Sequence, residues 1–185
     1  WDLYRREDIR LADNPRPPRD YPAIAGTTWG EVRVYHGMPK QGPLTDDQAK
    51  TLIHGYLACV SYVDAQIGKV VAELDRLGLA DNTVIVLWGD HGWKLGEHGM
   101  WSKQTNFEID TRAPLICVAP GQTAGQKTKA LTEFVDLYPS LCELCGLTLP
   151  AQLEGTSFVP LMKKPDRAWK TAAFSQYPRG KVMGY

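Results

Sequence analysis

The 185-residue sequence predicts an α/β protein, and the order of its elements carries that prediction. A long stretch with helical periodicity comes first, and two short continuous apolar runs follow it, separated by a polar loop. Runs of this kind are typical of strands in a mostly parallel sheet that is covered by helices. We therefore expect a partial α/β domain whose central sheet lies between helices.

Composition excludes several classes of protein. The 21 basic and 21 acidic residues give a formal net charge of zero, so the basic excess typical of nucleic-acid or anionic-membrane partners is absent. Apolar residues make up 43% and charged residues 23%, which is ordinary for a globular domain. No apolar run approaches the roughly 18 residues that a membrane span requires. We expect neither a nucleic-acid nor a membrane partner.

Residues 1–43 are expected to form an irregular connecting segment. Six of the thirteen prolines lie there, and Pro15, Pro17, Pro18 and Pro22 are clustered. Proline fixes φ and removes a backbone donor, which disfavours regular structure. We expect this segment to lie over a surface rather than to build the core.

A long amphipathic helix is predicted over residues 45–77. Thr45 and Gln48 have the spacing of a capping box, and apolar residues then recur at steps of three and four. Gly78 is the expected stop. His54 lies on this helix, where we interpret it as a packing or hydrogen-bonding residue.

Two strands and a short helix are predicted further along the chain. Residues 83–88 and 115–118 are continuous apolar runs, which indicate strands buried on both faces. Asp136 is the expected cap of a short helix that Gly146 ends.

The four cysteines give weak signals. Cys142 and Cys145 form a C-x-x-C, which suits a redox pair or half a zinc site. A second cysteine pair or a histidine pair for zinc is missing from the sequence, and both residues lie in an apolar helical stretch. We favour buried packing over chemistry for them.

The loop between the two strands holds the strongest functional signal. It reads GDHGWKLGEHGMWSKQTN over residues 89–106, with four glycines in eleven positions, which favours a tightly folded loop over a helix. It directly follows a predicted strand, where open α/β sheets place their ligands. The alternative is a hydrogen-bonded surface loop without chemistry.

Three residues of this loop suit a site for a metal ion and an anion. Asp90 supplies hard oxygen for calcium or magnesium, and His91 can ligate the ion or contact a bound anion. Two residues do not complete such a shell, so other ligands must come from elsewhere. Lys103 is the expected contact for sulfate or phosphate oxygens and for charge on a leaving oxygen.

The loop and the strand after it resemble the type I sulfatases. The block GDHGWKLGEHGMWSKQTNFEIDTRAPLICVAPG is similar to a signature region of that family, most of all in the iduronate-2-sulfatase group. Shorter matches cover residues 62–68, 135–139, 153–155 and 175–179, so the resemblance extends over about residues 44–185.

The resemblance implies a fold, a site and a substrate class. The fold would be the alkaline-phosphatase-like sandwich, with residues 44–150 as the later part of its catalytic domain and 151–185 as the start of a truncated C-terminal subdomain. Asp90 and His91 would lie at a calcium site. Lys103, together with His91, would act in catalysis, and Lys103, Trp93 and His98 would contact a sulfated uronate-containing glycan such as a glycosaminoglycan. The family implies a periplasmic, secreted or lysosomal location.

The family's nucleophile is missing from this sequence. Type I sulfatases use a formylglycine made from the first residue of a C/S-x-P-S-R or C/S-x-A-x-R motif, and neither motif occurs in the 185 residues. The early aspartate pair that the family places at its metal site is missing too. We therefore expect the formylglycine upstream, a partner in the missing N-terminal half of the domain, and no sulfatase activity in this chain alone.

Two other functions stay open at this point. The same metal and anion chemistry suits a phosphodiesterase or phosphonate hydrolase of the same superfamily. A non-catalytic binding domain that keeps the scaffold is the third reading.

Overall fold

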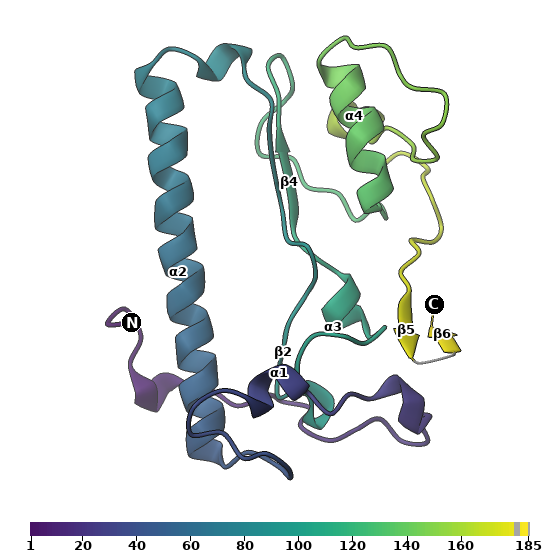
Figure 1. Cartoon of the computed structure of the whole chain (residues 1–185). Helices are drawn as coiled ribbons and strands as arrows, with labels where there is room; N and C mark the ends of the chain where they lie inside the picture. The colour runs from purple at the N-terminus through teal and green to yellow at the C-terminus, as the bar shows by residue number, and fades with distance from the viewer. Residues whose placement is uncertain (180–181, 185) are drawn as a thin grey trace. The chain divides into compact units, whose positions relative to one another are not determined.

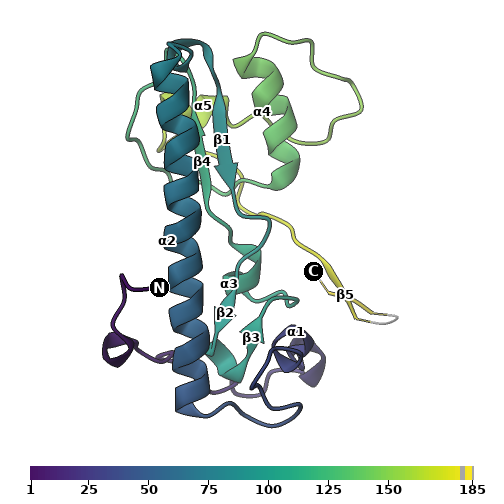
Figure 2. The ribbon, with the colours of Figure 1, turned by 60° about the vertical axis from the view of Figure 1, so that its left-hand side comes forward.

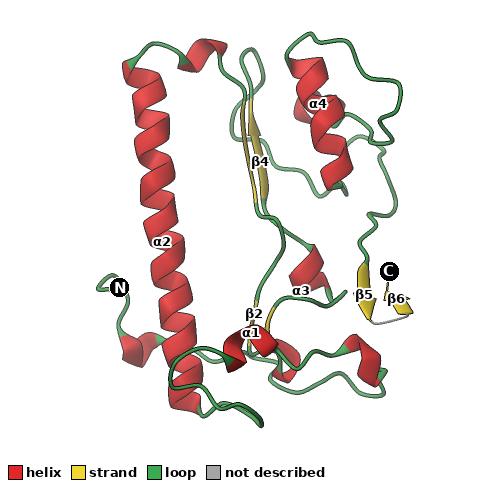
Figure 3. Cartoon of the chain, viewed as in Figure 1, coloured by secondary structure: helices red, strands yellow, loops and turns green. Residues whose placement is uncertain are grey.

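The structure is a computed structural model, which describes residues 1–179 and 182–184. Its helices and strands are interspersed along the chain (Figures 1 and 3). They are α1 (Gly30–Arg33), α2 (Asp46–Arg76), β1 (Ile85–Trp88), β2 (Lys94–Leu95), β3 (Trp101–Ser102), α3 (Glu108–Thr111), β4 (Leu115–Val118), α4 (Leu137–Leu144), α5 (Val159–Lys163), β5 (Tyr177–Arg179) and β6 (Val182–Gly184). They fall into two compact units, one formed by residues 1–73, 89–113 and the chain from 176, the other by 74–88 and 114–175.

Local signals define both ends of α2, as predicted. The Thr45 hydroxyl accepts the backbone N–H of Gln48 at 3.2 Å, and the Gln48 side chain accepts the backbone N–H of Thr45 at 3.0 Å. At the other end Gly78 has φ +67°, and the N–H of Leu79 reaches the carbonyl of Leu74 at 3.0 Å. This is the Schellman arrangement, which a glycine adopts without steric cost.

Only the first turns of α2 are buried. Ala49, Ile53 and His54 are buried, whereas Val60, Val63 and Val70 further along are exposed. The amphipathic pattern predicted over residues 45–77 is therefore matched by burial in the first turns and not at these three valines. The predicted packing and hydrogen-bonding role of His54 is confirmed, since its ring stacks on Trp1 and its Nε2 lies 3.0 Å from the Trp1 carbonyl oxygen.

The two predicted strands form, but their pairing differs from the expectation. β1 and β4 pair antiparallel, with Ile85 opposite Val118 and Trp88 opposite Leu115 (Figure 2). The parallel arrangement was wrong for this pair because residues 89–114 fold into a loop that returns the chain at the same end of β1, with no helical crossover. Ile116 and Val118 are exposed, so burial on both faces was also wrong in the described structure.

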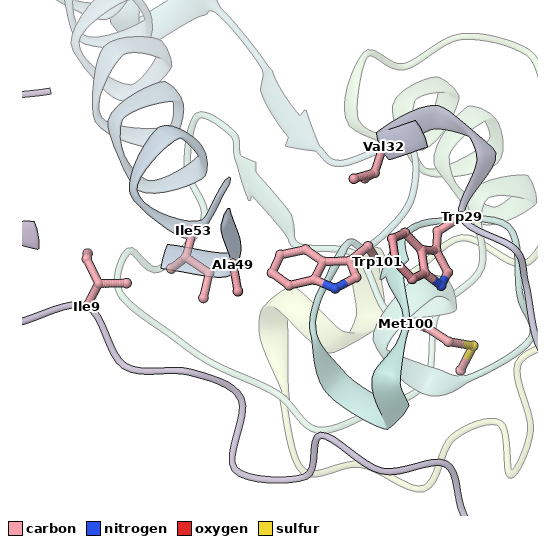
Figure 4. Close-up of a cluster of buried hydrophobic side chains, with 7 residues drawn as sticks. All are labelled: Ile9, Trp29, Val32, Ala49, Ile53, Met100 and Trp101. Carbon is pink, nitrogen blue, oxygen red and sulfur yellow. The ribbon is translucent and has the colours of Figure 1, made fainter. Parts of the chain in front are cut away.

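The proline-rich segment contributes to a core, which corrects the prediction for residues 1–43. That segment is largely irregular, as expected, but it buries Ile9, Trp29 and Val32. These side chains form one cluster with side chains of α2 and of the loop after β1 (Figure 4). The members are Ile9, Trp29, Val32, Ala49, Ile53, Met100 and Trp101. Proline restricts the backbone but leaves neighbouring apolar side chains free to be buried.

The short helix α4 ends as predicted but begins differently. Gly146 has φ +65°, and the N–H of Leu147 reaches the carbonyl of Cys142 at 2.8 Å. The side chain of Asp136 does not cap α4, because it is buried and bonded elsewhere. Cys142 is buried, as expected, whereas Cys145 is exposed because it lies at the helix end.

The helices of the described residues include none that is long and apolar enough to cross a membrane.

Candidate functional site

The candidate residues lie on the segment after β1, which we call the site loop (residues 89–113). Glycines shape it: Gly96 has φ +114° and Gly99 φ +70°, which a side chain would disfavour. The loop forms a two-stranded hairpin, with Lys94 opposite Ser102 and Leu95 opposite Trp101, and both glycines lie in the turn between the two strands. The tightly folded loop predicted from the glycines is confirmed.

Asp90 and His91 form an exposed acid–imidazole pair. The Asp90 side chain is 84% exposed, and its Oδ2 lies 3.2 Å from His91 Nε2. The other ring nitrogen, Nδ1, lies 2.8 Å from the carbonyl oxygen of Gly92, which can only accept, so Nδ1 carries a proton. In the neutral ring the lone pair of Nε2 then faces the carboxylate. Such a pair suits a shared proton or a shared cation.

Trp93 lies next to both His91 and Lys103. Its ring is stacked with that of His91 at a centroid distance of 6.2 Å and with that of Tyr56 on α2 at 6.3 Å. The Lys103 Nζ lies 5.2 Å from the Trp93 ring centroid, within the range of a cation–π contact. Asp90, His91, Trp93 and Lys103 therefore belong to one connected group.

Lys103 has a carboxylate partner from outside the loop. Its Nζ lies 3.4 Å from Oε2 of Glu31 on α1, and its side chain is 30% exposed. The Tyr35 hydroxyl donates to the other oxygen of Glu31 at 3.2 Å. Burial first, and the Glu31 charge second, raise the pKa of Tyr35, so the phenol stays a donor. Glu31 thus holds Lys103 by a contact that an incoming anion could replace.

His98 makes other contacts. Its ring stacks on Phe107 at 4.8 Å, and its backbone N–H donates to the Asn14 carbonyl at 2.8 Å. It has φ +58°, an uncommon conformation for a residue other than glycine. These contacts hold the hairpin tip, and the role of His98 toward substrate stays a prediction.

Sequence reasoning missed a buried ionic cluster behind the site. Lys94 is 0% exposed, and its ammonium pairs with the carboxylate of Asp110 on α3. Thr105 joins them through its hydroxyl and its N–H. No sequence signal marks this cluster, because Lys94 follows one tryptophan and precedes one leucine as many surface lysines do. Glu31 was missed too, because it lies far in the sequence from Lys103, the residue that it contacts.

A hollow of about 220 Å³ lies in the same unit, away from the candidate residues. It is lined mainly by apolar side chains, with Asp46 as its one acidic member. Because Asp90, His91, Trp93 and Lys103 do not line it, it is separate from the candidate site.

Comparison with known proteins identifies the family. The sequence matches the Sulfatase family over residues 11–147. It is 33% identical to iduronate 2-sulfatase of Mus musculus, in an alignment that covers 96% of this chain and 41% of the relative. It is 35% identical to a sulfatase of Formosa agariphila, over 100% of this chain and 37% of the relative. Among solved structures, a phosphonate monoester hydrolase from Silicibacter pomeroyi matches with a TM-score of 0.79 and 31% identity, over 95% of this chain and 36% of that one.

The chain belongs to the sulfatase family, and its fold is part of the alkaline-phosphatase-like α/β fold of that family. The resemblance seen in the site loop is therefore confirmed, as is the α/β class. The chain spans about two fifths of the length of the curated relatives named above.

The donor set fits part of a divalent-cation site. Within residues 1–179 and 182–184, no group of three or more His, Cys, Asp and Glu side chains is placed to hold a metal ion. Asp90 offers an exposed carboxylate, and His91 Nε2 lies beside it. The Nδ1–H group of His91 donates a hydrogen bond to a backbone carbonyl oxygen, as is usual for histidines that bind a metal through the other nitrogen. Calcium takes six to eight ligands, so this pair suits one side of a shell.

Proposed function

We propose that the complete gene product containing this chain hydrolyses sulfate esters. The observation that carries the proposal is the connected group of Asp90, His91, Trp93 and Lys103, on the site loop of a chain that belongs to the sulfatase family. A carboxylate–imidazole pair and a cation beside one aromatic ring suit a bound divalent ion and a bound anion.

Each residue has a proposed role. Asp90 and His91 would hold Ca²⁺, or Mg²⁺ in its place, and that ion when bound would balance the negative oxygens of the substrate. Lys103 would leave Glu31 to contact the sulfate and would stabilise charge on the departing oxygen. Trp93 would pack against the sugar, and His98 would border the pocket from the hairpin tip.

The nucleophile is proposed to come from outside this chain. The sequence holds no formylglycine motif, so that group and the remaining metal ligands would belong to the N-terminal half of the catalytic domain. The chain by itself is then predicted to be inactive. The boundaries at residues 43 and 150 and a periplasmic, secreted or lysosomal location remain predictions.

The proposed substrate class is a uronate-containing glycan such as a glycosaminoglycan. Its support is the similarity to iduronate 2-sulfatase over nearly the whole chain. An aromatic surface next to one lysine suits contact with one sulfated sugar unit of such a glycan, and the zero net charge of the sequence agrees with the lack of a broad basic surface for the whole polymer.

A phosphonate monoester hydrolase is the second candidate. The structural match to such an enzyme favours it, and sulfate and phosphonate esters are both tetrahedral anions that the same lysine and cation would accept.

One assay separates these functions. The complete gene product is supplied with Ca²⁺ and given 4-nitrophenyl sulfate, a disaccharide with a sulfated uronate, and 4-nitrophenyl phenylphosphonate. The proposal expects the highest kcat/KM with the sulfated uronate. A preference for the phosphonate would favour the second candidate, and turnover of none of them would favour a non-catalytic binding domain.

A further inference from the structure

Three hydrogen-bond donors meet at the carboxylate of Asp110. Its Oδ2 accepts the ammonium of Lys94, the N–H of Thr105 at 2.7 Å and the Thr105 hydroxyl at 2.5 Å. Among the described residues, its Oδ1 is buried without a hydrogen-bond partner. Three donors thus converge on one oxygen of a side chain that is 3% exposed.

Stability alone does not explain why a buried ion pair stands at this position. Removing two charges from water is costly, and apolar residues of the same volume often replace such pairs at no loss of stability. An ion pair differs from an apolar contact because its hydrogen bonds are directional, and they fix one arrangement of the chain segments that supply them. The segments here are β2, the chain after β3, and α3.

The backbone of Asp110 holds a fourth segment. Its carbonyl accepts the N–H of Gly92 at 2.7 Å. A Cβ at Gly92 would lie 1.8 Å from the carbonyl oxygen of Ile109, so only glycine allows this approach. Gly92 directly follows His91 and directly precedes Trp93.

We propose that Asp110, with Lys94 as its counterion, is the positioning residue of the candidate site. Its backbone fixes the residue between His91 and Trp93, and its carboxylate fixes Thr105, two residues after Lys103. It thereby sets how Lys103 lies against Trp93 and His91, without touching substrate. This inference rests on the proposed function for its catalytic consequence only; the positioning itself is a property of this chain.

The structural arm of the test uses the complete gene product that contains this chain. NMR contacts between the Lys103 side chain and the Trp93 ring, and hydrogen exchange of the Gly92 amide, are measured well below the unfolding temperature. Asp110→Asn is expected to weaken the Lys103–Trp93 contact and to speed Gly92 exchange at least about tenfold. Thr105→Val, which removes one hydroxyl and keeps the shape, should do both to a smaller extent and serves if Asp110→Asn does not fold.

The matched control is Asp136→Asn. Asp136 is a buried carboxylate that also pairs with a lysine, Lys170, but it lies in the other unit, which contains none of the candidate residues. It should leave the Lys103–Trp93 contact and Gly92 exchange unchanged. If the folded Asp110→Asn or Thr105→Val chain keeps both, or if Asp136→Asn disturbs them equally, the positioning role is wrong.

The catalytic arm uses the complete gene product with 4-nitrophenyl sulfate. Asp110→Asn is expected to lower kcat at least about tenfold at equal folded fraction, as small misplacements of reacting groups do. Asp136→Asn should stay within about twofold, because Asp136 bonds to residues of the other unit, which contains none of the candidate residues. An equal loss in both variants would overturn the inference. If the unsubstituted protein does not turn over sulfate esters, the proposed function fails, and the structural arm still decides the positioning.

Discussion

Two buried aspartates, one in each compact unit, anchor their surroundings in the same way. Asp110 accepts the N–H of Thr105, and Asp136 accepts the N–H groups of Glu133 at 2.9 Å and Thr156 at 2.8 Å. Each also accepts a lysine ammonium. A carboxylate offers several acceptor positions, so one side chain can join several backbone segments.

Each aspartate also has a glycine packed against the peptide that precedes it. A Cβ at Gly92 would lie 1.8 Å from the Ile109 oxygen, and a Cβ at Gly155 would lie 1.9 Å from the Val135 oxygen. In both places the absence of a side chain lets a second segment reach the aspartate.

The lysines differ, and so do the consequences. Lys94 is 0% exposed and lies in the loop that carries the candidate site, whereas the Lys170 side chain is 23% exposed and also binds Glu133 at 2.7 Å. Burial works against the charge of Lys170, but hydrogen bonds to Asp136 and Glu133 outweigh it and raise its pKa. The Asp110 arrangement lies in the unit that contains the candidate residues, and the Asp136 arrangement joins segments of the unit that contains none of them.

The largest effect on stability is expected at Asp110. Asp110→Asn leaves the Lys94 charge buried without its counterion and should lower the free energy of unfolding by about 3–5 kcal/mol. Urea denaturation of the chain measures it. The double variant Lys94→Met/Asp110→Asn removes both charges and should recover most of the loss. A double variant as unstable as the single one would contradict a charge-based explanation.

The two glycines should show the next largest effect. Gly92→Ala and Gly155→Ala both force a backbone shift, for which about 1–3 kcal/mol or more is expected. Their unfolding midpoints should fall alike, but only Gly92→Ala should also reduce the turnover of a sulfate ester per folded molecule of the complete gene product. Equal turnover in the two variants would remove the functional distinction between the regions.

Lys170→Met should have a smaller effect that depends on pH. The hydrogen bond from Lys170, first, and that from the Phe174 N–H lower the pKa of Glu133 below its ordinary 4.5. A lowered carboxylate pKa gives stability that is present above the ordinary value and lost as pH falls through the folded value. The loss in Lys170→Met, about 1.5–3 kcal/mol at neutral pH, should therefore shrink at about pH 3.

The check is urea denaturation of both proteins at the two pH values. Lys69→Met is the control and should show no such trend, because Lys69 is an exposed residue of α2 whose ammonium donates to the Gln66 side chain at 3.2 Å. A loss that stays constant down to acid pH would contradict the role of the Glu133 charge.

The smallest effect is expected at Glu31. It and Lys103 are both partly exposed, and such ion pairs contribute about 0–1 kcal/mol. In thermal unfolding, Glu31→Gln should change the free energy of unfolding by less than about 1 kcal/mol. In the complete gene product Glu31→Gln should lower KM for a sulfate ester, because Lys103 loses its carboxylate partner and becomes free to contact the anion. A large loss of stability would show that Glu31 is part of the core instead.

The parts of the fold that the sequence predicted depend on neighbouring residues. The cap of α2 involves residues three positions apart, and its end involves Gly78 and the turn before it, so local rules suffice. The apolar runs marked β1 and β4 but not their direction, since an apolar run does not encode which partner it pairs with.

The candidate site was predictable to the same extent. Asp90, His91, Trp93 and Lys103 are close in sequence, on a glycine-rich loop whose composition marks it. The residues that hold them are not: Glu31 comes from α1, and Asp110 is 16 positions from Lys94. Their roles follow from tertiary contacts, which no single-sequence pattern contains.

The turnover of a sulfate ester by the Lys103→Ala variant shows whether Lys103 acts on the bound sulfate. In the complete gene product with Ca²⁺, we expect kcat to fall at least about 10²-fold, the usual scale for an electrostatic group at a reacting centre. Asp90→Asn should behave alike, and Lys69→Ala on the surface of α2 should match the unsubstituted protein. Near-normal turnover in folded Lys103→Ala would contradict the assignment of the site loop as a sulfate-binding site.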